Sequence, residues 1–244
     1  AKNETGRVNL YKLISASHID YYSKRPRIPK SVYLEHSEGL IIGSACEAGE
    51  LYQAVLNHRT PAEIDRLARF YDYFEIQPLA NNSFMIDNDR YDVKTDEDLR
   101  EINRKIVELG DEYNKPVVAT CDVHFLDSED ELYRRIIMTG KGFKDADNQP
   151  PLYFRTTNEM LDEFDYLGKE KAREVVITNT NKIANQIDYV APVRPDKYPP
   201  VIEDSDKMLR NTCFEKAHSM YGPDLPSTVE QRLEKELNSI ISNG

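Results

Sequence analysis

Apolar positions between residues 95 and 113 recur at intervals of three and four residues. The series consists of Leu99, Ile102, Ile106, Leu109 and Tyr113. This spacing places the side chains on one stripe of a helix, the face that packs against a core. Thr95 and Asp98 precede the stripe at the spacing of a capping box. The pattern therefore predicts an amphipathic helix over residues 95–113.

Three short apolar runs lack helical spacing and predict β-strands. They cover residues 40–46, 71–78 and 117–124. Short runs of this kind are typical of strands when polar or proline-containing segments bound them. Helical patterns over residues 47–56 and 61–69 lie between the first two strands, and the helix at 95–113 precedes the third. The alternation of strands and helices indicates an α/β fold with a parallel sheet.

Each predicted strand ends in polar groups that can coordinate a metal. The pairs are Cys46 with Glu47, Glu75 with Gln77, and Asp122 with His124. The carboxyl ends of parallel strands lie on one face of a sheet or barrel. In a strand, Asp122 and His124 would point to the same side, because side chains alternate along the backbone. A complete (β/α)₈ barrel needs about 250 residues, so either the sheet is open or part of the barrel is missing from this chain.

The second half of the chain is predicted to be helical. One helix is indicated at residues 156–164, and a second follows Gly168 with these residues expected to be buried: Ala172, Val175, Val176, Ile183, Ala184 and Ile187. Prolines at positions 192, 195, 199 and 200 predict a semi-rigid linker. Beyond it, amphipathic helices are predicted over 204–221 and 227–241, the latter opened by a capping box at Ser227 and Glu230. Two helices are close to the lower limit for an independent core, so they are interpreted as the start of a further domain.

Composition narrows the possible functions. The formal net charge of −11 argues against tight DNA binding by this chain itself, because nucleic-acid-binding surfaces are basic. The dense basic stretch at residues 24–30 is interpreted as a solvated loop. Cys46, Cys121 and Cys213 form no CxxC pair, which fits a reducing, cytoplasmic compartment. No apolar stretch reaches the length of a membrane-spanning helix, so no membrane partner is expected. Because the chain starts with Ala1, we interpret it as a trimmed or internal fragment.

Several segments, taken in order, resemble the PolC-type DNA polymerase III alpha subunit family. In that family the region is similar to the later part of the polymerase-and-histidinol-phosphatase (PHP) domain, a distorted β/α barrel into which a proofreading exonuclease is inserted. The segments that carry the resemblance are residues 2–6, 9–13, 17–21, 26–29, 38–46, 74–78, 117–126, 154–157 and 232–237.

The resemblance implies a partial, distorted β/α (PHP-type) barrel followed by an α-helical segment. Residues 1–190 would form the C-terminal part of the PHP domain, 191–203 a Pro-rich linker, and 204–244 the helical start of the polymerase palm. The larger protein would carry out DNA-directed DNA synthesis with an associated 3′–5′ exonuclease. Its partners would be primer–template DNA and replisome subunits that include the sliding clamp. This chain alone would have no polymerase active site.

The resemblance also implies a partial metal site. Cys46 matches the cysteine of the Gly-Ser-Ala-Cys segment, while Asp122 and His124 match the closing Asp-x-His motif. The cysteine favours Zn²⁺ or Mn²⁺ over Mg²⁺, and the other ligands of the family would lie outside this chain. Cys121 stands where the family usually has glycine. No catalytic residue is assigned.

Two alternatives stay open. A free-standing, metal-dependent phosphoesterase of the PHP type would also place Asp122 and His124 at a strand end. A non-catalytic structural or interaction module would carry the same residues as a vestigial site, and an isolated Asp-x-His motif is more often structural than metal-binding. Phosphatase and exonuclease assays with added Mn²⁺ separate the phosphoesterase from the other two.

Overall fold

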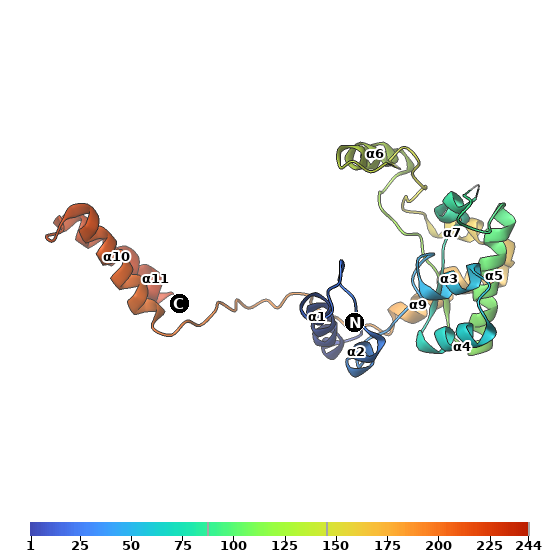
Figure 1. Ribbon diagram of the computed structural model, residues 1–244, viewed down its shortest axis with the longest axis horizontal. Helices are drawn as coiled ribbons and strands as arrows, with labels where there is room; N and C mark the ends of the chain where they lie inside the picture. The colour runs from blue at the N-terminus through green and yellow to red at the C-terminus, as the bar shows by residue number, and fades with distance from the viewer. Residues whose placement is uncertain (87, 145, 244) are drawn as a thin grey trace. The chain divides into compact units, whose positions relative to one another are not determined.

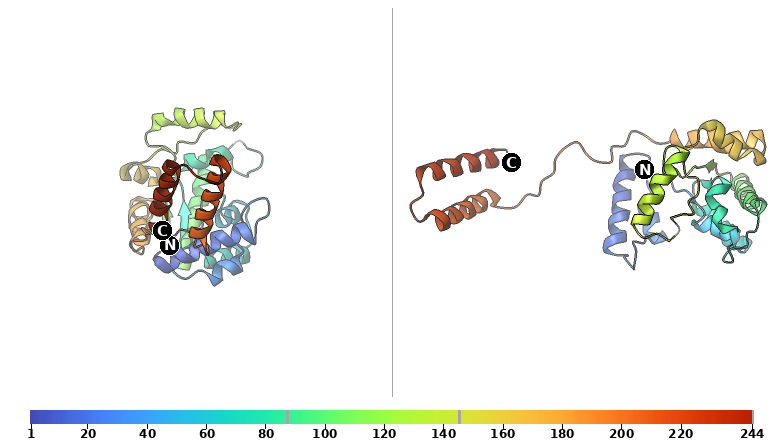
Figure 2. Two further views of the ribbon diagram at one scale, coloured as in Figure 1. Left: turned by 90° about the vertical axis from the view of Figure 1, so that its left-hand side faces the viewer. Right: turned by 90° about the horizontal axis from the view of Figure 1, so that it is seen from above.

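The computed structural model describes residues 1–86, 88–144 and 146–243, and its backbone divides into two compact units at the Pro192–Val193 junction. The first unit combines many helices with a short parallel sheet, so the predicted α/β class is confirmed in its coarse form (Figures 1 and 2). Its elements are α1 (Glu4–Ile19), α2 (Lys30–Glu35), α3 (Glu50–Leu56), α4 (Pro61–Phe70), β1 (Phe74–Ile76), α5 (Asp96–Tyr113), β2 (Val117–Ala119), α6 (Glu131–Gly140), α7 (Thr157–Glu163), α8 (Lys169–Arg173) and α9 (Asn179–Ala184).

The sheet of the described residues contains β1 and β2, paired in parallel with Phe74 opposite Val117 and Ile76 opposite Ala119. The strand predicted over 40–46 is wrong as a strand. That segment meets β1 through one isolated bridge between Gly43 and Tyr73. Ala45 has a φ of 61°, which turns the backbone out of the extended conformation before Cys46 is reached. The two-stranded sheet of the described residues therefore does not establish a complete barrel.

The helix predicted over 95–113 is confirmed as α5. Leu99, Ile102, Ile106 and Leu109 are all buried, and Thr95 and Asp98 form the predicted capping box. The stripe packs in one hydrophobic core with residues from α3, α4 and β1. Burial of this stripe holds α5 against the sheet, because helices are stabilised mainly by packing of an amphipathic face.

The segment after Pro78 forms a short 3₁₀ helix, Leu79–Met85. Asn81 and Asn82 of this helix are buried although their side chains are polar. The Nδ2 of Asn81 donates to the carbonyl of Cys121 at 3.2 Å. A buried polar side chain is retained where it satisfies another buried polar group, and this bond connects the turn to the segment that follows β2.

The N-terminal helix docks through two glycines. The amide of Lys2 donates to the carbonyl of Gly39 at 2.7 Å. A Cβ on Gly6 would collide with that carbonyl, and Gly39 has a φ of 73° that side chains other than glycine rarely adopt. The two backbones can approach this closely only because both positions lack a side chain.

The helical region after Gly168 differs in detail from the prediction. Ala172 and Val175 are buried as expected. A π-helical turn, Glu174–Thr178, separates α8 from α9, and α9 ends at Ala184. Ala184 and Ile187 are exposed, so their predicted burial is wrong. Ala184 follows the wider π turn, which shifts the 3.6-residue period on which the prediction rests, and Ile187 lies beyond the end of α9.

The second unit consists of α10 (Ser205–Tyr221) and α11 (Ser227–Ser242). Arg210 joins the two helices, because its Nη1 donates to both carboxylate oxygens of Glu234 at 2.7 and 2.8 Å. The predicted capping box at Ser227 is wrong, because α11 begins at Ser227 and its N-cap, Pro226, makes no side-chain bond. Within the part of the chain that the structure describes, no helix combines the length and the apolar character needed to cross a bilayer.

Candidate functional site

The ends of β1 and β2 and the loop before Cys46 are joined by a small hydrogen-bond network. The backbone amide of Glu75 donates to the Oγ of Ser44 at 3.0 Å, and Ser44 is buried. The Oγ1 of Thr120 donates to the Glu75 carboxylate at 2.9 Å. Glu75 thus connects the two segments that carry the predicted site residues, one on each side of β1.

Asp122 and His124 meet, although not by strand alternation. β2 ends at Ala119, and Asp122 has a φ of 56°, so residues 120–124 are not an extended strand. The Nδ1 of His124 lies 2.7 Å from the carbonyl oxygen of Asp122 and 3.8 Å from its carboxylate. Because a carbonyl oxygen can only accept a hydrogen bond, Nδ1 must carry the proton and donate it. In the neutral ring, Nε2 then keeps a free lone pair. In this tautomer a histidine can bind a metal through Nε2.

Cys46 lies in a turn closed by the Gly49 amide, which donates to the Cys46 carbonyl at 2.9 Å. Partial burial raises the pKa of its thiol, and the neighbouring Glu47 acts in the same direction. The thiol is therefore held in its protonated form, whereas a metal ligand is a thiolate. A nearby cation would have to reverse this preference.

Across residues 1–86, 88–144 and 146–243, no three His, Cys, Asp or Glu side chains are grouped so that they could hold a metal ion. Cys46, Asp122 and His124 therefore do not make a three-ligand site by themselves. The Asp122–His124 pair has the right chemistry for two donors, and further donors would have to come from elsewhere.

Arg155 is a residue of this region that the sequence did not single out as a site residue. Its side chain is 2% exposed, and its Nε donates to Glu163 at 3.1 Å. Its Nη1 lies 3.4 Å from the Sγ of Cys121, and the guanidinium stacks over the Tyr153 ring at 4.6 Å. Arg155 thereby fixes the segment that precedes Asp122 to the end of α7. The signal that could have found it is its place in the segment 154–157, which carries the family resemblance.

Glu75 gives a pH-dependent expectation. Burial raises the pKa of its carboxyl, and the charge of Asp122 acts in the same direction, against the hydrogen bond from Thr120. A raised folded-state pKa means stability that is present below the ordinary pKa of glutamate and is lost as the pH rises through the folded value. We therefore expect Glu75→Gln to gain stability relative to the wild type as the pH rises from about 4 to 7.

Urea unfolding followed by circular dichroism at a series of pH values measures this difference. Glu35→Gln, at an exposed position on α2, is the control for exchanging a carboxylate for an amide. If the midpoints for Glu75→Gln and the wild type run parallel with pH, the folded structure does not disfavour the Glu75 carboxylate.

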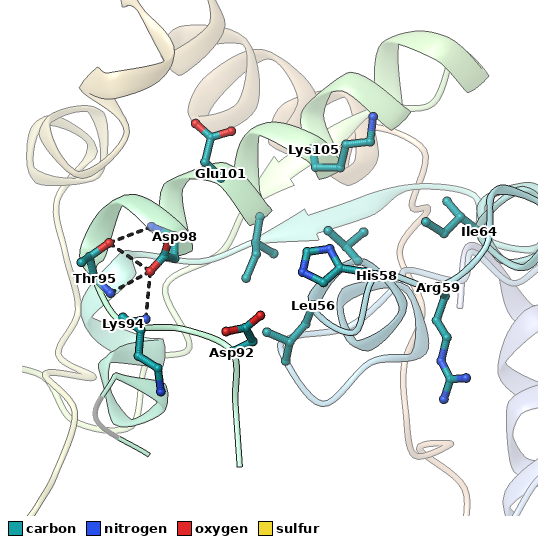
Figure 3. A pocket seen from close by; sticks show the side chains of 12 residues that line it. Leu56, His58, Arg59, Ile64, Asp92, Lys94, Thr95, Asp98, Glu101 and Lys105 are labelled. Carbon is teal, nitrogen blue, oxygen red and sulfur yellow. Dashed lines mark hydrogen bonds between the residues drawn. The ribbon is translucent and has the colours of Figure 1, made fainter. Parts of the chain in front are cut away.

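A separate cavity of about 750 Å³ lies between the α3–α4 turn and the start of α5 (Figure 3). Apolar side chains such as Leu56 and Ile102 line it, and charged groups of both signs, including Asp92, Lys94 and Lys105, stand around it. None of its lining residues is one of the predicted metal ligands. The mixture of charges indicates no single class of ligand.

Comparison with known proteins finds similarity along the whole chain. Residues 1–79 match the family described as the PHP domain. The whole chain matches DNA polymerase III PolC-type of Clostridium perfringens (60% identical), of Caldanaerobacter subterraneus (55%) and of Bacillus subtilis (44%). The resemblance to PolC-type DNA polymerase III is confirmed. The matches cover 100% of this chain but only 17% of each PolC-type relative.

Proposed function

We propose that this chain is a segment of a PolC-type replicative DNA polymerase and serves there as part of the PHP scaffold. The observation that carries the proposal is the 60% identity to a PolC-type protein along the entire chain. Residues 1–190 would be the C-terminal part of the PHP domain, 191–203 the linker, and 204–244 the start of the palm. The partial β/α barrel would be completed by residues outside this chain.

The proposal includes DNA synthesis, with exonuclease activity, by the larger protein. Primer–template DNA and replisome subunits, including the sliding clamp, would be its partners, in the cytoplasm. The similarity to DNA polymerase III PolC-type proteins supports the polymerase activity proposed for the larger protein. The net charge of −11 supports a scaffold role for this segment, and in this proposal the DNA contacts would lie elsewhere in the protein.

A divalent cation, Zn²⁺ or Mn²⁺ more readily than Mg²⁺, would be held in the larger protein by Cys46, Asp122 and His124 together with further donors. When bound, such an ion supplies Lewis-acid chemistry toward a phosphoester. The Nδ1–carbonyl contact of His124 supports this role, because it orients the ring and leaves Nε2 for the ion. No catalytic step is assigned to this chain, since its described donors do not form a three-ligand group.

Two measurements on the larger protein test the proposal. Extension of a primed template tests polymerase activity, and we expect it from the larger protein and not from residues 1–244 alone. Metal content by mass spectrometry tests the site, and we expect Asp122→Ala and His124→Ala to lower bound Zn²⁺ or Mn²⁺. His218→Ala is the matched control, because the Nδ1 of His218 also faces a carbonyl, that of Gly222 at 3.1 Å.

Equal metal loss in the His218 variant would overturn the ligand assignment. Phosphoester hydrolysis by residues 1–244 with Mn²⁺, abolished by Asp122→Ala, would instead establish the free-standing phosphoesterase. Full metal content and no hydrolysis in the Asp122→Ala and His124→Ala proteins would favour the non-catalytic module.

A further inference from the structure

Helix α6 presents apolar side chains on every turn, yet none of its ten residues is buried. Leu132, Tyr133, Ile136 and Ile137 are between 47% and 64% exposed. Their spacing of one and four residues places them on a single stripe of the helix. In Figure 1 the helix stands at the end of two extended segments that connect it to the rest of its unit.

Such a helix lacks the interactions that normally keep a helix folded. Isolated helices shorter than about 12 residues are marginal in water, and most helical stability in proteins comes from burial of an apolar face. Exposed apolar side chains gathered on one surface mark an interaction site. One side of this stripe is therefore expected to be covered when the helix is stably formed.

A groove runs along one side of this helix. It has a volume of about 630 Å³ and is bounded on the other side by Phe125, Leu126 and Phe143. From α6 itself, Tyr133 and Ile137 line the groove, whereas their neighbours Leu132 and Ile136 do not. The groove has the size and apolar lining of a site that takes anchoring side chains from an amphipathic segment.

The charge around this groove differs from that of the chain. Residues 131–144 contain four basic side chains and one acidic one, whereas the chain as a whole has a net charge of −11. Arg134 and Lys141 line the groove together with one acidic residue, Asp130, which directly precedes α6. A segment that places carboxylates beside its apolar anchors would complement the two basic side chains, because opposite charges across an interface favour the correct register.

We propose that the α6 groove binds an apolar, acid-flanked segment of the larger polypeptide outside residues 1–244. The inference rests on the proposed function, in which this chain is one part of a PolC-type polymerase. The relatives extend far beyond it, since the chain covers 17% of their length. His124 also lines the groove, so the bound segment lies next to the candidate metal ligands and limits solvent access to them.

Hydrogen exchange followed by mass spectrometry tests this in the larger protein and in residues 1–244. In residues 1–244 alone, we expect the amides of α6 to exchange nearly as fast as those of an unstructured peptide. In the larger protein, we expect exchange to be slower by about 100-fold, which corresponds to about 2.7 kcal/mol of local protection.

Two adjacent variants give the test its specificity. Ile137→Asp places a carboxylate in the groove, and we expect it to abolish the protection. Ile136→Asp makes the same chemical change at a position with nearly equal exposure, 59% against 58%, that does not line the groove. We expect the Ile136→Asp variant to retain most of the protection. It controls for the loss of helix propensity that aspartate causes at either position.

The outcomes separate the inference from the proposed function. A larger protein that extends primers but shows no added protection of α6 overturns the inference and leaves the polymerase assignment intact. Protection that is sensitive to Ile137→Asp in a protein without polymerase activity supports the groove and contradicts the polymerase assignment. Protection that arises in residues 1–244 as concentration increases assigns the groove to a second copy and overturns the proposal, as does equal sensitivity to both variants.

Discussion

Replacing Phe74 by alanine is expected to destabilise the first unit by about 3–5 kcal/mol, the usual cost of removing a fully buried aromatic ring. Phe74 is 0% exposed and opens β1 opposite Val117. Its amide donates to the Pro116 carbonyl at 2.9 Å, so the backbone is held and cannot collapse into the vacated space. Because Glu75 follows directly, the bonds to Ser44 and Thr120 are expected to loosen as well.

Urea unfolding and hydrogen exchange of the β1 and β2 amides measure this loss. Phe84→Ala is the matched control, because Phe84 is 41% exposed and its ring makes an edge contact with Tyr91, with the ring centroids 5.9 Å apart. Removing it is expected to cost about 1 kcal/mol. Equal losses for the two variants would mean that the core does not depend on the ring at β1.

Replacing Arg155 by alanine is expected to cost about 3 kcal/mol, the lower end for breaking a buried ion pair, because the Arg155 side chain is 2% exposed but that of Glu163 is 29% exposed. The change leaves Glu163 without its guanidinium and removes the contacts with Cys121 and the Tyr153 ring. The segment that leads to Asp122 would lose its attachment to α7. A change in the His124 ring signals in nuclear magnetic resonance spectra is therefore expected beside the loss of stability.

Arg69→Ala is the control for this experiment. Arg69 also pairs with a carboxylate, Asp65 at 2.9 Å, but its side chain is 69% exposed. Exposed ion pairs contribute little, since both charges stay solvated, so we expect a much smaller change and no effect on His124. A large loss in Arg69→Ala, or unchanged His124 signals in Arg155→Ala, would contradict the role assigned to Arg155.

The elements that the sequence predicted correctly are those with local causes. Helix α5 has a regular apolar stripe and its own capping box, and both are formed. The strands around Phe74 and Val117 were found as apolar runs, although each is shorter than its run. The strand predicted at 40–46 fails because a strand exists only through its neighbour, and Ala45 turns the chain away after a single bridge.

In the candidate site too, local sequence and tertiary structure account for different features. The sequence placed Asp122 and His124 together for a reason, strand alternation, that the left-handed backbone at Asp122 does not support. They still meet, through the contact of Nδ1 with the Asp122 carbonyl. The three predicted ligands remain a prediction, since the described residues contain no group of three donors that could hold a metal ion.

The sequence by itself determined the amphipathic helix α5, the two paired strands and the resemblance to PolC-type polymerases. Apolar periodicity and the order of motifs depend on residues close together in the sequence. They can therefore be recognised without knowledge of the tertiary structure. Only the tertiary structure decided that Arg155 is buried against Cys121 and that the apolar stripe of α6 is not buried at all. Burial depends on which segments, distant in the sequence, pack together. The same periodic pattern of apolar residues is compatible with a helix face that is packed in the core and with one that is exposed.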